Sequence, residues 1–166
     1  MYEPSVGVPL LVDCPSVETA TVDAPVSILD ILPTMADALG IEADPHWRGV
    51  SQWSVLTGER APDRHRTVFA EYHAHGTSRG MFMLRDGQYK YVHYPDHPPQ
   101  LFDLQVDPDE LTNLADDPAY EPVLDRFRQR LTERVDPDPA TVDRRARRDQ
   151  RRRQSRPVEQ WWGASG

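Results

Sequence analysis

The sequence predicts an α/β fragment followed by a small α+β subdomain with a four-stranded antiparallel sheet and a C-terminal helix. Three observations support this: an apolar run precedes a helical pattern, four strand-like segments follow, and a second helical pattern comes after Tyr120. We expect residues 1–60 to be a terminal strand and helix of an α/β layer. Residues 61–135 then form the sheet subdomain, and residues 136–166 form an Arg-rich tail, helical or docked in an oligomer.

The first element is the apolar run VGVPLLVDC at residues 6–14. Its apolar character is continuous rather than alternating, which is typical of a strand buried on both faces. The run ends at Cys14, the single cysteine of the chain, so no intrachain disulfide is possible. This favours a reducing compartment.

The second element is a helix within PVSILDILPTMADALG at residues 25–40. One apolar helical face is made by Ile28, Leu32, Met35 and Leu39. Because proline disrupts a helix interior, we predict a turn at 27–31 and then a helix that begins at Pro33 and ends at Gly40. One strand and one helix cannot complete a doubly covered sheet, so we expect this part to expose apolar surface.

Four segments between residues 67 and 104 have the composition of short strands. They are TVFAEY (67–72), RGMFMLRDG (79–87), QYKYVHY (88–94) and QLFDL (100–104). Asp86-Gly87 predicts a two-residue hairpin between the second and third strands. Before them, residues 41–66 read as a loop with a turn of helix around Trp53–Leu56.

A one-turn helix is predicted directly after the fourth strand, within VDPDELTN. Asp107 has the features of an N-cap, with Pro108 at the first helical position and Glu110 at the capping-box position. Asn113 suits a left-handed stop.

The last predicted helix follows Asp117-Pro118, which repeats the start pattern. Leu124, Phe127 and Leu131 then recur at helical spacing. This helix would cover one face of the small sheet.

The formal net charge of −8 is unevenly distributed. Residues 1–140 carry 11 basic and 24 acidic side chains, whereas residues 141–166 carry 8 and 3. An acidic body should repel nucleic acid and anionic membranes. No apolar stretch approaches the ~20 residues of a membrane span, and no signal-peptide pattern follows Met1. We therefore expect a cytoplasmic protein with no nucleic-acid or membrane partner.

Five segments, in this order, resemble the C-terminal third of a sulfatase of the alkaline phosphatase-like superfamily. They are MYEPSVGVPLLV, PVSILDILPTMADALG, VFAEY, GQYKYVHY and PQLFDLQVDPDELTNLADDP. The phrase EYHAHG and the Arg-rich ending resemble the choline-sulfatase branch in particular, where a Glu often stands at the position of His75. The resemblance implies that residues 1–60 end an alkaline phosphatase-like catalytic domain and that the following sheet is the sulfatase C-terminal subdomain.

The resemblance also implies the chemistry of a sulfuric ester hydrolase. Sulfatases use a formylglycine made from a C/S-x-P-x-R motif and a divalent cation, usually calcium, held by acidic side chains. In the family these groups lie upstream of the MYEPS-like segment. The stretch that begins Cys14-Pro15 does not fit, because the proline comes one place too early and no arginine follows. We expect no catalytic residue, metal ligand or cofactor in this chain, and no activity of the chain alone.

The candidate substrate-binding residues are Glu71, Tyr72, His73 and His75. They end a strand before Gly76, in the region that contributes to the substrate pocket of choline-sulfatase-like enzymes. There Glu71 would face a quaternary ammonium group and Tyr72 would offer a cation–π face; otherwise Glu71 is an ordinary strand-end carboxylate. His73 and His75 share a face if the strand continues, but a zinc site lacks a third ligand.

The tail carries the run RRARRDQRRR at 144–153 and the pair Trp161-Trp162. Basic runs can bind nucleic acid, but the acidic body favours a solvated helix or a segment that docks on an acidic neighbour. Two exposed indoles likewise suggest docking on another surface.

Three functions stay open on the sequence. The first is a sulfatase C-terminal fragment, a remnant or a partner of a separate N-terminal half, with a small sulfate ester as the substrate of the complete enzyme. The second is a non-catalytic interaction subunit or homo-oligomer. The third is a fragment of a related phosphate or phosphonate monoester hydrolase.

Overall fold

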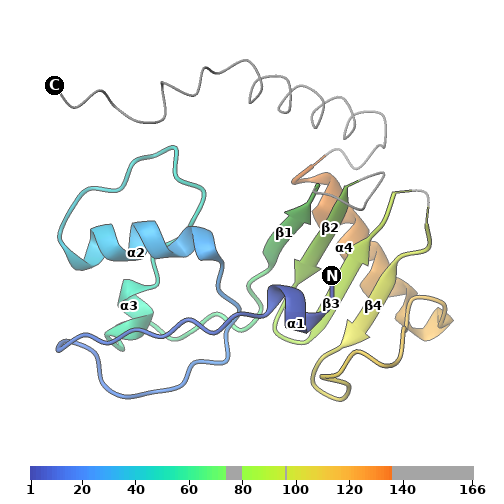
Figure 1. The fold of residues 1–166 in the computed structure, drawn as a ribbon, viewed down its shortest axis with the longest axis horizontal. Helices are drawn as coiled ribbons and strands as arrows, with labels where there is room; N and C mark the ends of the chain where they lie inside the picture. Colours follow the sequence, from blue (N-terminus) through green and yellow to red (C-terminus); the bar gives the residue numbers. More distant parts are fainter. Residues whose placement is uncertain (74–79, 96, 136–166) are drawn as a thin grey trace, which may run out of the picture.

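The computed structural model describes residues 1–73, 80–95 and 97–135 of the chain. Figure 1 shows a sheet with α4 against it and a neighbouring region that contains α2 and α3. Helix α1 (Glu3–Val6) lies on the sheet near the N-terminus. Among the described helices, none has the length and apolar character needed to cross a membrane.

The sheet contains four antiparallel strands in the order β1-β2-β3-β4. They are β1 (Val68–Tyr72), β2 (Met81–Arg85), β3 (Tyr89–His93) and β4 (Gln100–Asp103). All four lie within the segments that the sequence predicts, so the predicted sheet is confirmed.

The β2–β3 hairpin is displaced by one residue from the prediction. The Asp86 N–H donates to the Tyr89 carbonyl at 3.0 Å, so the two-residue loop is Gly87-Gln88 rather than Asp86-Gly87. Asp86 Oδ1 accepts the backbone N–H groups of Gln88 at 3.1 Å and Tyr89 at 2.7 Å. The aspartate closes the turn from its first position, a role that its short polar side chain favours.

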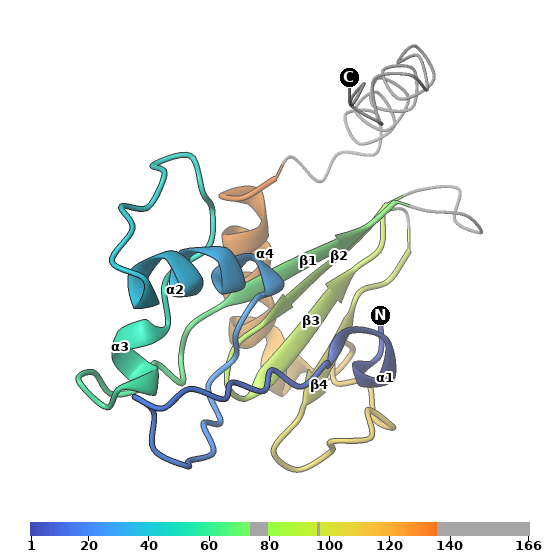
Figure 2. The ribbon, with the colours of Figure 1, turned by 60° about the vertical axis from the view of Figure 1, so that its left-hand side comes forward.

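Helix α4 (Glu121–Thr132) covers one face of the sheet (Figure 2) and is preceded by the 3₁₀ helix η2 (Pro118–Tyr120). Asp117 caps this start because its Oδ1 accepts the Ala119 N–H at 2.9 Å. The main hydrophobic core lies between α4 and the sheet and consists of Phe82, Leu84, Tyr91, Leu101, Leu124, Phe127 and Leu131. The predicted terminal helix is therefore confirmed.

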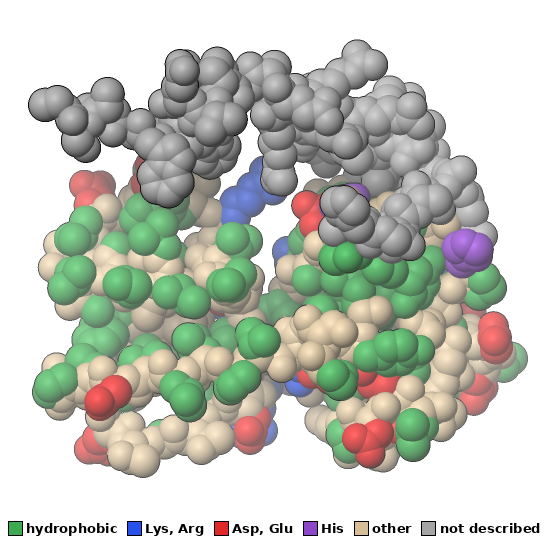
Figure 3. Space-filling view, viewed as in Figure 1, with side chains coloured by type: hydrophobic (Ala, Val, Ile, Leu, Met, Phe, Trp, Pro, Cys, Tyr) green, Lys and Arg blue, Asp and Glu red, His purple; other side chains and the backbone are tan. Residues whose placement is uncertain are grey.

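The second predicted helix forms as the 3₁₀ helix η1 (Ile28–Asp30) and α2 (Ile31–Ala38), followed by Gly40 with φ of +66°. It starts two residues before Pro33, which still lies in its first turn, where proline is tolerated. The predicted turn at Trp53–Leu56 forms α3. Figure 3 shows apolar side chains gathered over this region. The exposed ones on the helical face include Ile28 (77%), Leu32 (52%), Met35 (56%) and Leu39 (69%).

The strand predicted at residues 6–14 is wrong. Beyond α1 this run has no regular structure, and Val8 and Leu11 are 76% and 90% exposed. A strand needs a neighbour for its backbone N–H and C=O groups. Within the described residues the sheet contains no strand that pairs with this run. Its apolar composition therefore does not lead to a buried strand here.

The one-turn helix predicted at 107–113 is also wrong. Asp107 instead caps a turn, since its carboxylate accepts the N–H groups of Leu111 at 3.1 Å and Thr112 at 2.8 Å. Glu110 has φ of +57°, in the left-handed region, and not Asn113 as predicted. A helix cannot continue through such a residue.

The segment after this turn covers the edge of β4. Asn113 Oδ1 accepts the Leu101 N–H at 2.9 Å, and the Leu114 N–H donates to the Leu101 carbonyl at 2.8 Å. These bonds satisfy the backbone groups of an edge strand. The DPDELTNLA stretch thus has two roles: it connects the sheet to α4, and it covers the exposed edge of β4.

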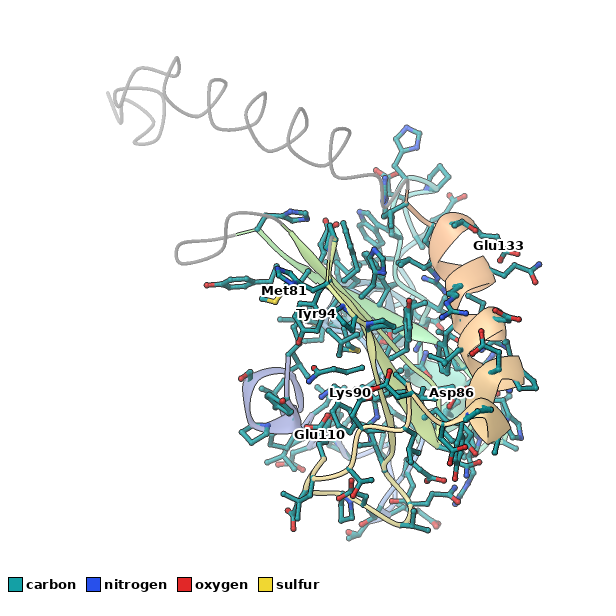
Figure 4. The ribbon with its side chains drawn as sticks, turned by 90° about the vertical axis from the view of Figure 1, so that its right-hand side faces the viewer. Met81, Asp86, Lys90, Tyr94, Glu110 and Glu133 are labelled. Atoms are coloured by element: carbon teal, nitrogen blue, oxygen red, sulfur yellow. The ribbon has the colours of Figure 1, made fainter. Side chains whose placement is uncertain are left out.

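The face of the sheet opposite α4 carries α1, as Figure 4 shows with Lys90 and Glu110 on that side. Lys90 is fully buried, and its Nζ lies 3.2 Å from Glu3 Oε1 and 2.7 Å from Glu110 Oε1. Arg85 Nη1 lies 2.7 Å from Glu3 Oε2. A helix too short to be stable alone is held on the sheet by these charges.

Candidate functional site

The candidate site is a row of side chains across three strands near the end of the sheet. Glu71 on β1 is paired with Phe82 on β2, and Phe82 is paired with His93 on β3. Residues directly opposite one another in an antiparallel sheet project to the same face. Glu71, Phe82 and His93 therefore share a face, which is also the face covered by α4.

His73 joins this row because it lies two residues after Glu71 on the same face. Its Nε2 lies 3.3 Å from Glu71 Oε2, and its ring meets Phe82 edge-on at a centroid distance of 5.5 Å. The side chains of His73 and Glu71 are 31% and 49% exposed. The pair is an accessible carboxylate–imidazole group that rests on an aromatic ring.

His93 lies deeper in the row. Its Nδ1 is 3.4 Å from the Tyr91 hydroxyl. Burial lowers the pKa of His93, because desolvation disfavours the charged imidazolium. Burial also raises the pKa of Tyr91, so the phenol keeps its proton. We call Glu71, His73, Phe82, Tyr91 and His93 the Glu71 cluster. Its Glu71–His73 pair is accessible, whereas Phe82 and Tyr91 are buried beneath α4.

The structure brings together only part of the predicted binding set. Glu71 and His73 meet, but Tyr72 projects to the opposite face of β1 because side chains alternate along a strand. The expectation that one ammonium group contacts both Glu71 and Tyr72 is therefore not supported by this strand. His75 lies outside the described residues.

His93 is the member of the cluster that the sequence reasoning missed. It continues the alternation of Tyr89 and Tyr91 along β3. The hairpin at Asp86 sets the register that places it beside Phe82, so strand alternation plus the turn could have identified it.

Metal-binding residues do not come together in the described part of the chain. No group of three or more His, Cys, Asp or Glu side chains is placed there to hold an ion. The resemblance places the calcium ligands upstream of this chain. Cys14 has a free thiol, and the basic run at 144–153 and Trp161-Trp162 lie outside the described residues.

Two curated relatives show sequence similarity over the same part of the chain. Arylsulfatase K from Mus musculus is 42% identical over 125 residues, which are 69% of this chain and 23% of that protein. Choline-sulfatase from Rhizobium meliloti is 39% identical over 120 residues, 70% of this chain and 23% of that protein. The chain thus spans about a quarter of the length of these relatives.

Two solved structures have the same arrangement of elements. A 2-O GAG sulfatase superimposes with a TM-score of 0.66 and 30% identity over 82% of this chain and 29% of its own. A phosphonate monoester hydrolase from Silicibacter pomeroyi gives a TM-score of 0.56 and 32% identity over 72% of this chain and 27% of its own. These matches confirm the fold class as that of sulfatase C-terminal regions in the alkaline phosphatase-like superfamily.

A family model described as "N-sulphoglucosamine sulphohydrolase, C-terminal" matches residues 1–136. This range includes α1, the α2–α3 region, the whole sheet and α4. The chain therefore belongs to the sulfatase family, in the region that this C-terminal model describes.

Proposed function

We propose that this chain is the C-terminal part of a sulfatase and that it has no hydrolytic activity alone. The main support is the family match over residues 1–136, in a chain that spans only 23% of the length of its curated relatives. The division into residues 1–60, 61–135 and 136–166 is part of this proposal, as is a cytoplasmic location. The nucleophile and the metal ligands would come from an N-terminal half.

The proposed partner surface is the exposed apolar face of α2 together with residues 8–12. Within the described residues, Val8, Leu10, Leu11 and Val12 are all at least 43% exposed. So much exposed apolar side chain is unusual for a monomer and is typical of an interface. An N-terminal sulfatase half is the occupant that the relatives' extra length favours; a second copy of this chain is the alternative, as in an interaction subunit.

Reconstitution tests this proposal. The purified chain with calcium should not hydrolyse p-nitrophenyl sulfate or choline sulfate. Adding an N-terminal half from the choline-sulfatase relative should restore turnover, and Leu32→Glu should weaken the restoration because it places a charge in the apolar face. Asp44→Glu, on an exposed loop, is the matched control. Turnover that follows the isolated chain through purification would contradict the proposal.

The substrate-facing residues would be Glu71, His73 and His93. His75 and Tyr72, which the sequence also predicts, belong to the proposed set, with Tyr72 on the opposite face of β1. The Glu71 carboxylate would attract a cationic leaving group such as choline. In the reconstituted enzyme, Glu71→Gln should raise KM for choline sulfate more than KM for an aryl sulfate. Glu59→Gln, another exposed glutamate, is the control. Equal changes in both KM values would reject this role.

A phosphate or phosphonate monoester is the second candidate substrate, because the phosphonate monoester hydrolase is as similar in sequence as the sulfatase structure. The two are separated by kcat/KM of the reconstituted enzyme for phenyl phosphonate and phenyl sulfate esters. A higher value for the sulfate ester supports the sulfatase assignment.

A further inference from the structure

We propose that a small tetrahedral oxyanion, sulfate or phosphate, binds in a cavity lined by four arginines at the end of α4. The cavity measures about 370 Å³, and its polar lining is Arg48, Arg66, Thr67, Arg130, Glu133 and Arg134. Figure 3 shows basic side chains where the α2 region meets the sheet, and Figure 4 labels Glu133 at the end of α4. We call this the arginine cavity.

One wall is fixed by the buried carboxylate of Asp30. Arg66 Nη1 and Nη2 lie 2.6 and 2.8 Å from its two oxygens. The Val50 N–H donates to Asp30 Oδ1 at 2.9 Å, which holds the loop that carries Arg48 against Asp30 at the start of α2. The wall is therefore built before any ligand arrives.

The other wall comes from the end of α4, where two arginines converge on Thr67. Arg130 Nη1 donates to Thr67 Oγ1 at 2.6 Å, and Arg134 Nη2 donates to the Thr67 carbonyl at 3.2 Å. A guanidinium has five N–H donors, so each arginine keeps donors for a ligand. Because Thr67 Oγ1 accepts from Arg130, its own hydroxyl proton is left to donate.

The arginine cavity has a surplus of positive charge, whereas the body of the chain is acidic. Asp30 neutralises Arg66 in an ion pair. Arg130 lies 3.8 Å from Asp86, and that carboxylate also pairs with Arg126 at 3.1 Å. Within the described residues, neither Arg48 nor Arg134 has an acidic partner within 4.0 Å, and Glu133 is the single acid of the lining. The net charge of the lining is therefore positive. The planar guanidinium of arginine can donate two parallel hydrogen bonds to the oxygens of sulfate or phosphate.

The arginine cavity is separate from the Glu71 cluster. Thr67 directly precedes β1, whereas Glu71 is the fourth of its five residues. At about 3.3 Å per residue, the two positions are roughly 13 Å apart along the strand. The proposal therefore does not depend on the substrate residues or on the sulfatase assignment.

Titration of the full chain with sodium sulfate and sodium phosphate, followed by NMR of the arginine side-chain N–H and the Thr67 amide, tests this site. Chloride at the same ionic strength is the reference. Arg48→Gln and Arg134→Gln should each weaken sulfate binding by about tenfold, as expected for loss of one charge-assisted contact. Arg60→Gln, an exposed arginine outside the lining, should leave it unchanged.

Two further measurements keep the result decisive. Arg48 and Arg134 are exposed, so their variants should keep the wild-type circular dichroism spectrum, and Arg134→Lys should restore part of the affinity.

p-Nitrophenyl sulfate and phosphate show whether the cavity takes an esterified group or the free ion; binding of either supports the proposal. Sulfate shifts no larger than chloride shifts, or equal weakening in all three glutamine variants, would overturn it.

Discussion

Lys90 and Glu110 form a buried ion pair, with 2.7 Å between Nζ and Oε1 and side chains that are 0% and 1% exposed. Glu3 completes the group, since its Oε1 lies 3.2 Å from Lys90 and its backbone N–H donates to Glu110. The pair joins the middle of the sheet to the DPDE turn and to α1. The single lysine of the chain therefore organises three segments that are far apart in sequence.

Glu110→Gln should lower the free energy of unfolding by about 2 kcal/mol, because it removes one partner and leaves the Lys90 charge buried with Glu3 alone. Urea denaturation followed by circular dichroism measures the change. Asp109→Asn, its exposed neighbour, should change stability by less than about 0.5 kcal/mol. Equal effects of the two substitutions would show that the buried pair is not stabilising.

Asp30→Asn should lower the free energy of unfolding at pH 7 by about 3 kcal/mol, because it unpairs Arg66. Burial alone would raise the pKa of Asp30, but its hydrogen bonds from Arg66, Val50 and Ser27 hold that pKa below its usual range. A carboxyl whose pKa is lower in the folded state stabilises the fold above the unfolded pKa, and this is lost as pH falls through the folded pKa.

The difference in stability between wild type and Asp30→Asn should therefore shrink as the pH falls below about 4. Asp23→Asn is the control, since Asp23 makes an exposed contact of 3.8 Å with Arg64. A constant difference from pH 7 to pH 3 would contradict the assignment.

Gly49→Ala should destabilise the chain by more than about 2 kcal/mol, because an added Cβ would lie 1.9 Å from the Leu29 carbonyl oxygen. Because this oxygen belongs to the backbone, the clash would displace the loop that contains Gly49 from the start of α2. Gly40→Asn is the matched control, because Gly40 has open space around it and asparagine tolerates its positive φ. Thermal unfolding of both variants checks the prediction; equal melting temperatures would refute it.

The imidazole of His93 should titrate below pH 6.5, the ordinary histidine value, because burial lowers its pKa. Since the unfolded chain binds this proton more readily, stability should rise with pH between the folded pKa and about 6.5. NMR of the imidazole C–H resonances measures the titration, and His93→Gln identifies the signal. A titration midpoint above 6.5 would contradict the burial of His93.

Local chemistry was sufficient to predict the four strands, the turn at Trp53–Leu56 and α4. The strands have aromatic and branched residues between turns. Before α4, Asp117 caps the 3₁₀ helix η2, and α4 itself has apolar residues at helical spacing. These features lie within a few residues of one another, so a linear reading detects them. The same holds for Glu71, near the end of β1, and His73, which directly follows that strand.

Partners distant in sequence decided the rest. The apolar run at 6–14 could form a strand only beside a neighbouring strand that the described residues do not contain. A strand predicted from its composition alone was therefore wrong. Glu110 takes a left-handed conformation and pairs with Lys90 instead of capping a helix. His93 reaches Phe82 through strand register. Segment patterns specify which elements form, whereas burial, charge pairing and register exist only once those elements meet, because each arises between groups that the chain separates by many residues.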